Sequence, residues 1–216
     1  MIRELGTLTL QHLGLVAVAV AVGAAAVVGI PLGVMAARSA LLGQVELMSV
    51  GVLQTIPALA LLCFMIPFLG IGTVPSLVAL FLYALLPIVH GTYTGLATLD
   101  RRLLEVADVL GLRGRRRLTR IELPLASVSI LAGLKTSAIL TVGTATLAAF
   151  VGGGGYGTLI VRGLALDDVA TILAGAIPAA LMALLLHALF EIVDRLLIPR
   201  GLRLSLSTGP LTRGDG

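Results

Sequence analysis

The side chains that could do chemistry are few in this sequence, and they form no catalytic pattern. The three histidines, His12, His90 and His187, stand apart from one another and from other metal-ligand types. The single cysteine, Cys63, lies in an apolar run, which excludes a disulfide framework and a cysteine-based metal site. The segment around Lys135 lacks the Gly-Lys pair and the upstream glycine of a phosphate-binding loop. We therefore expect no catalytic residue, no metal site and no ATP hydrolysis by this chain.

The composition indicates a membrane protein. Of 216 residues, 58% are hydrophobic and only 12% are charged, whereas soluble domains carry about 25% charged residues. The mean hydropathy of +1.09 agrees with this. These values exclude a soluble enzyme, a disordered chain and a nucleic-acid-binding domain. They favour a polytopic protein in a lipid bilayer, with no nucleic-acid partner.

Long runs without charge define the expected membrane spans. Charged residues are absent from 5–37, 47–99, 136–161 and 169–190, and one span needs about 20 apolar residues. The second run is long enough for two spans, and the glycines and proline of Phe68–Pro75 mark a turn inside it. We predict five spans in a single domain over residues 1–203, followed by a flexible tail over 204–216. The spans are placed at about 13–37, 47–69, 75–96, 125–151 and 169–198.

The basic residues predict the orientation of these spans. Twelve arginines fall on one set of span ends and loops, and only Arg3 and Arg162 fall on the other. Loops rich in Lys and Arg face the cytoplasm. The sequence therefore predicts an all-α membrane protein whose N-terminus is outside and whose C-terminus is inside, with a cytoplasmic loop over 98–124.

That loop has the pattern of a docked helix. Leu103, Leu104, Ala107 and Leu110 recur at helical spacing among charged residues. Gly111 follows the last of them, at the place of a left-handed C-cap. Arginines that only set topology need no apolar stripe, so we expect a short amphipathic helix outside the bilayer that contacts a partner protein.

The loop resembles the EAA signature of binding-protein-dependent ABC importer permeases: Glu-Ala-Ala, three residues, Gly, nine residues, Ile, any residue, Leu-Pro. Every spacing is kept, and the only departure is a valine at the second alanine. The matching residues are Glu105, Val106, Ala107, Gly111, Ile121, Leu123 and Pro124. The resemblance implies a coupling helix that seats on a separate ATP-binding subunit, where ATP and Mg²⁺ bind.

Further stretches resemble the osmoprotectant branch of this family, which imports glycine betaine, choline and carnitine. They are Gln54–Ala60, Ile66–Gly72, Gly133–Ser137 and Val142–Gly157. The resemblance implies the five-span core of type I importers in a bacterial plasma membrane. It also implies two permease subunits, identical or homologous, two ATPase subunits and an external binding protein. A permease for another small solute such as an amino acid stays open as an alternative, as does an ion channel.

Four polar positions are candidates for function. Lys135 lies inside the fourth predicted span, where a charge is costly and suggests a role in the pathway or gate; it could instead extend its side chain to the cytoplasmic surface. In the resembled family the outer glycine loop faces the binding protein, which makes Tyr156, Arg162 and Asp167 candidate contacts. Asp168 is predicted to cap the fifth span.

Overall fold

Every regular element is a helix in the computed structural model, which describes residues 2–24 and 28–197. The α-helices are α1 (Ile2–Ala24), α2 (Gly29–Arg38), α3 (Ala40–Thr55), α4 (Ala58–Leu69), α5 (Thr73–Ala97), α6 (Arg101–Val109), α7 (Arg115–Arg117), α8 (Leu123–Leu147), α9 (Gly157–Ala165) and α10 (Val169–Leu197). A π-helical segment, Leu118–Glu122, joins α7 to α8, and a 3₁₀ turn, Ala148–Val151, follows α8.

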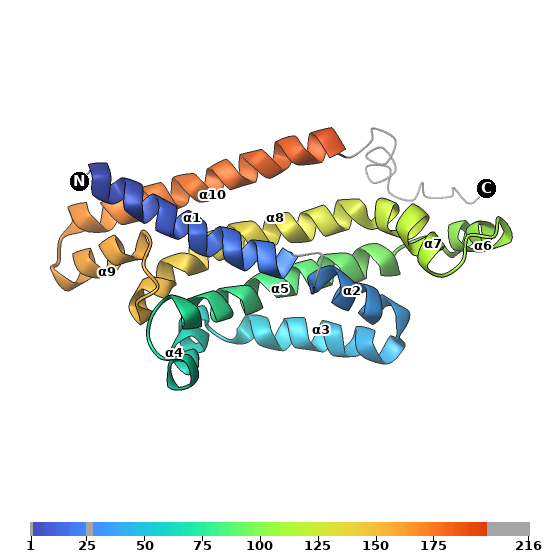
Figure 1. The fold of residues 1–216 in the computed structure, drawn as a ribbon, viewed down its shortest axis with the longest axis horizontal. Coiled ribbons are helices and arrows are strands. Elements are labelled where there is room, and N and C mark those ends of the chain that lie inside the picture. Colours follow the sequence, from blue (N-terminus) through green and yellow to red (C-terminus); the bar gives the residue numbers. More distant parts are fainter. Residues whose placement is uncertain (1, 25–27, 198–216) are drawn as a thin grey trace, which may run out of the picture.

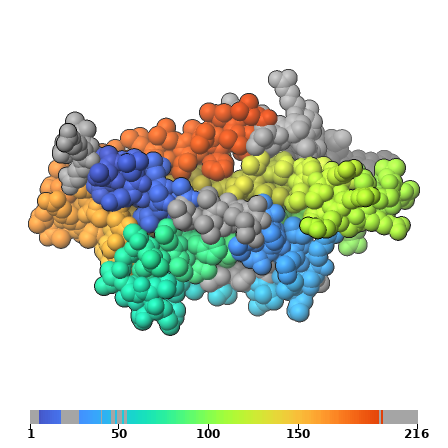
Figure 2. All heavy atoms as spheres, in the orientation of Figure 1, coloured from blue at the N-terminus to red at the C-terminus, as the bar shows by residue number. Residues whose placement is uncertain are grey.

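The long helices form an elongated bundle. Helices α1, α5, α8 and α10 run along its long axis, and α1 and α10 both pack against α8 (Figure 1). Helix α9 and the start of α1 lie at one end, while α6 and α7 lie at the other (Figure 1). In the space-filling view the atoms of α6 and α7 project as the tip of the molecule (Figure 2). We call the end that carries α6, α7 and the π segment (residues 100–122) the tip.

Helices α5 and α8 meet at the centre because glycines allow their backbones to approach closely. A Cβ added at Gly133 would lie 2.5 Å from the carbonyl oxygen of Pro87, and one added at Gly91 would lie 2.6 Å from that of Ser129. Small residues permit such contacts between membrane helices. A side-chain hydrogen bond also joins the pair, because the buried hydroxyl of Ser137 donates to the carbonyl of Ala84 at 2.7 Å.

Three helical stretches among the described residues are long and apolar enough to cross a membrane: Thr73–Ala97, Arg115–Val151 and Val169–Asp194. The predicted range 75–96 lies within the first of them. The predicted range 125–151 lies within the second of them, where the helical chain already begins at Arg115 and passes through Pro124. A proline is tolerated in the first turn of an α-helix, so it need not mark where the helical chain begins.

The first two predicted spans are not single helices. The range 13–37 falls on α1, which already begins at Ile2, and on the separate helix α2. The range 47–69 is divided at Ile56, because a residue before proline is disfavoured in the α conformation. The carbonyl freed there is paired, since the hydroxyl of Tyr83 donates to the Ile56 oxygen. The predicted tail 204–216 lies outside the described residues.

Candidate functional site

Helix α6 is capped at both ends, by a side chain at its start and by backbone bonds at its end. At its start the Asp100 carboxylate accepts a hydrogen bond from the N–H of Arg102 at 2.9 Å. At its end the N–H of Leu112 reaches the carbonyl of Ala107 at 2.9 Å, and the N–H of Gly111 reaches that of Asp108 at 3.1 Å. This pair of bonds is a Schellman motif. Gly111 has a φ of +79°, which confirms the predicted left-handed C-cap.

The apolar stripe predicted on α6 is covered along one edge and exposed along the other. Ala107 is buried and Leu104 is half-buried, so they form the inner face. Leu103, Val106 and Leu110 are 50%, 57% and 71% exposed. Their i, i+3, i+7 spacing places these three on one side of the helix. An exposed apolar patch of this kind marks an interaction surface, and we call these three residues the docking face.

A buried carboxylate connects the tip to the bundle. Glu122 is only 4% exposed. Its Oε2 accepts from Arg38 at the end of α2 at 2.6 Å, and its Oε1 accepts from Nε of Arg117 at 2.7 Å. The same arginine uses its terminal nitrogen to bind Asp108 of α6 at 2.6 Å. The hydrogen bond to Glu122, together with the pairing to Asp108, raises the pKa of the Arg117 guanidinium, so it stays charged.

The remaining residues of the EAA signature lie where the tip joins α8. Leu123 is half-buried and packs against the buried cluster of Leu96, Ala126 and Ile130, whereas Pro124 is exposed. Pro124 has no N–H for the carbonyl of Arg120, and in the adjoining π segment the N–H of Leu123 instead reaches Leu118. The signature therefore covers both the exposed helix and its attachment to the bundle.

Lys135 has a partner that the sequence analysis missed. Its Nζ donates to Oε1 of Glu191 on α10 at 2.5 Å. The pair links α8 to α10. The sequence did contain a signal for this pair. Glu191 directly follows the charge-free run 169–190, and a charge next to a membrane segment requires a partner. The same reasoning would have singled out Glu122.

At the opposite end, α1 supports the glycine loop (residues 152–155). The ring of His12 is fully buried and lies 5.1 Å from that of Tyr156, measured between centroids. The hydroxyls of Tyr156 and Thr9 are hydrogen bonded at 2.7 Å. Tyr156 is only 5% exposed, so it supports this loop from within, which corrects its expected role as a surface contact.

The exposed polar residues of this end lie just beyond the loop. Arg162 and Asp167 are both exposed. Asp168 accepts from the N–H of Ala170 at 3.0 Å, which confirms that it caps α10. Hydrogen bonds from Thr171, and then from Ala170, lower the pKa of the Asp168 carboxyl.

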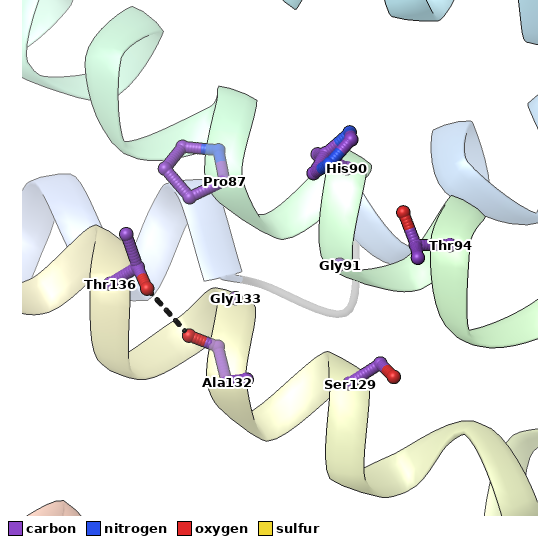
Figure 3. Close-up of a pocket in the computed structure, with 8 residues that line it drawn as sticks. All are labelled: Pro87, His90, Gly91, Thr94, Ser129, Ala132, Gly133 and Thr136. Carbon is purple, nitrogen blue, oxygen red and sulfur yellow. Dashed lines mark hydrogen bonds between the residues drawn. The ribbon is translucent and has the colours of Figure 1, made fainter. Parts of the chain in front are cut away.

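A groove of about 340 Å³ opens between α5 and α8. His90 and Thr94 reach it from α5, and Ser129 and Thr136 from α8, with glycine backbone between them (Figure 3). The Thr136 hydroxyl donates to the carbonyl of Ala132 at 2.9 Å. Aromatic and acidic side chains are absent from the lining residues, and Lys135 is not among them. The described residues contain no cluster of three or more metal-ligand side chains.

The bundle of long apolar helices is that of a helical membrane protein, and the docking face at its tip is exposed. A chain of the inward-facing MetNI methionine ABC transporter has the same fold and superimposes with a TM-score of 0.83. The match covers 92% of this chain and 98% of that one at 21% identity. The chain belongs to the family of binding-protein-dependent transport system inner membrane components, which its residues 29–202 match.

Several curated transport permeases are similar in sequence over most of this chain. The glycine betaine/carnitine/choline transport system permease protein OpuCB of Bacillus subtilis is 40% identical over 193 residues, 89% of this chain and 88% of that one. The choline transport system permease protein OpuBB of the same organism is 40% identical over 195 residues, 90% and 89% of the two chains. The osmoprotectant import permease protein OsmW of Salmonella typhimurium is 39% identical over 204 residues, 92% and 94%.

Proposed function

We propose that this chain is the permease subunit of an ATP-driven importer for quaternary ammonium osmoprotectants such as glycine betaine, choline and carnitine. The names of its relatives support the substrate class. The observation that carries the coupling role is α6, a capped helix at the tip whose docking face is exposed. In the complex this face is covered by an ATP-binding subunit, which hydrolyses ATP for the transporter.

The chain crosses the bacterial plasma membrane five times in this proposal, with its N-terminus outside. The five crossings are α1 with α2, α3 with α4, α5, α8 and α10. Successive crossings run in alternating directions along the long axis, which supports this assignment (Figure 1). The bond between Arg38 and Glu122 supports it too, because it brings the junction of α2 and α3 to the tip.

The groove between α5 and α8 forms part of the solute pathway. A second permease subunit, identical or homologous, faces it and encloses the pathway. Its hydroxyls and imidazole suit a small polar solute in transit. A tight site for a quaternary amine uses aromatic rings through cation–π contacts, and the groove lining provides none. Solute selection is therefore assigned to the external binding protein, whose docking site at the opposite end includes Arg162 and Asp167.

A growth experiment tests the proposal. The chain is expressed with its partner ATPase and binding protein in bacteria that lack betaine uptake. We expect growth at high osmolarity to be restored only when glycine betaine, choline or carnitine is supplied. Restored uptake of an amino acid without any restored betaine uptake would contradict the substrate class, and uptake without the ATPase would contradict ATP-driven transport.

A further inference from the structure

The EAA signature accepts any residue between its isoleucine and its Leu-Pro pair. In this chain that residue is Glu122, between Ile121 and Leu123. Its carboxylate nonetheless makes two ion pairs at the tip. Each oxygen binds a different arginine, one on α2 and one on α7. The side chain is 5% exposed, compared with 19% for Arg117 and 42% for Arg38.

The local helix geometry makes this double contact possible. Arg117 and Glu122 are five residues apart and would not face each other on an α-helix, where neighbours are three or four apart. The segment Leu118–Glu122 is π-helical, with bonds between residues five apart. That bonding pattern places residues five apart on the same side. The π segment therefore directs Glu122 towards Arg117 of α7.

The ion pairs form a continuous series from α6 to α2: Asp108 to Arg117, Arg117 to Glu122, and Glu122 to Arg38. A buried carboxylate that loses one partner is left uncompensated in a medium that solvates it poorly. A displacement of α6 therefore either breaks the series or carries α2 with it. The series also reaches α8, since Glu122 continues directly into that helix.

We propose that Glu122 is a positioning residue that makes α2 move together with α6. A displacement of α6 by the ATPase then reaches α2 through Arg38. It also reaches α8 through the chain itself. This inference rests on the proposed function, because it assumes that α6 is displaced by a partner ATPase. It assigns Glu122 to the transmission of movement and leaves the docking of the ATPase to the docking face.

The test uses the complete complex in proteoliposomes and measures ATP hydrolysis and betaine uptake together. In Glu122→Gln, which keeps the side-chain size but removes the charge, the complex assembles and hydrolyses ATP. Its uptake per ATP falls by roughly two- to thirtyfold, the range of coupling changes at residues that contact neither ligand. Glu122→Asp restores part of this ratio. Arg38→Gln lowers the ratio and Arg38→Lys preserves it, because only the lysine keeps a charge for Glu122.

Glu191→Gln is the matched control, since it removes a carboxylate from the ion pair between α8 and α10, outside the series. It should lower uptake per ATP less than Glu122→Gln does, because it does not interrupt the series from α6 to α2. Wild-type ratios in both Glu122→Gln and Arg38→Gln would overturn the inference, even if their melting temperatures fall. If the complex with Glu122→Gln fails to assemble, the two Arg38 variants provide the test, because the Arg38 side chain is more exposed. Failure of the wild-type complex to take up betaine with ATP would instead reject the proposed function.

Discussion

The tip and the groove between α5 and α8 are built in opposite ways. At the tip, caps and a series of ion pairs hold a short helix whose apolar docking face is exposed. In the groove, the lining combines three hydroxyl side chains and one imidazole with Pro87, Ala132 and glycine backbone, and none of these residues carries a fixed charge. A docking helix must keep one orientation, whereas a transit surface must release what it contacts. The difference supports the proposal that the tip couples to the ATPase and that the groove lets the solute pass.

The largest effect is expected at the cap of α6. Gly111→Val strains the left-handed cap by about 1–2 kcal/mol. Nothing lies within 4 Å of the added Cβ, so the effect is conformational. The variant should insert normally yet lose transport and co-purification with the ATPase. Gly111→Asn is the control at the same position, because asparagine tolerates this conformation, and it should keep both. Full transport by Gly111→Val would show that coupling does not need this cap.

The docking face should respond strongly to a charge. Val106→Asp places a carboxylate on a side chain that is 57% exposed, so the isolated permease should fold. The ATPase should dissociate during purification, because a buried unpaired charge disfavours the interface. Ile71→Asp, at a side chain 76% exposed near the opposite end, should leave co-purification unchanged. Equal losses in the two variants would show that the docking face has no special role.

The contact between α5 and α8 should respond through stability alone. Gly133→Ala adds a Cβ 2.5 Å from the carbonyl oxygen of Pro87, and overpacking of this kind costs about 1–3 kcal/mol. The purified permease should melt at a lower temperature. Gly143→Ala adds the same methyl group on α8 with nothing within 4 Å, and it should melt at or above the wild-type temperature. Identical melting of both variants would contradict the close approach.

The smallest effect is expected in the groove. Ser129→Ala removes one hydroxyl from its lining. The apparent KM for betaine uptake should change by less than about tenfold, the equivalent of one ordinary hydrogen bond. The order of preference among betaine, choline and carnitine should stay the same. A reversed order in this single variant would place selectivity in the groove.

Local signals in the sequence predicted the cap at Gly111, the cap at Asp168 and the all-helical fold. Each of these features is signalled within continuous segments of the chain, so no distant partner is needed to detect it. The pair of Glu122 with Arg38 and the pair of Lys135 with Glu191 were missed because the partners lie 84 and 56 residues apart along the chain. The division of the apolar stripe of α6 was missed for a similar reason, since only the packing of the tip decides which face is covered.

The helix breaks were harder to predict than the helices. Apolar composition continues through Ile56 and Pro57, so hydropathy indicated one span where the chain forms α3 and α4. The proline was visible, but prolines also lie inside α4, α5 and α10. A helix break differs from a proline inside a helix in that another group must pair with the carbonyl that the break leaves free. Here that partner is the hydroxyl of Tyr83, from a different helix.

One measurement tests the central claim directly. The purified permease is reconstituted into proteoliposomes with its ATPase, and its binding protein is supplied outside. Uptake of radiolabelled glycine betaine is followed with ATP or ADP inside the liposomes, with unlabelled choline, carnitine or methionine as competitor. The account predicts accumulation only with ATP and with the binding protein, inhibited by quaternary amines and unaffected by methionine. Betaine flux that is equal with ADP, or independent of the binding protein, would contradict it.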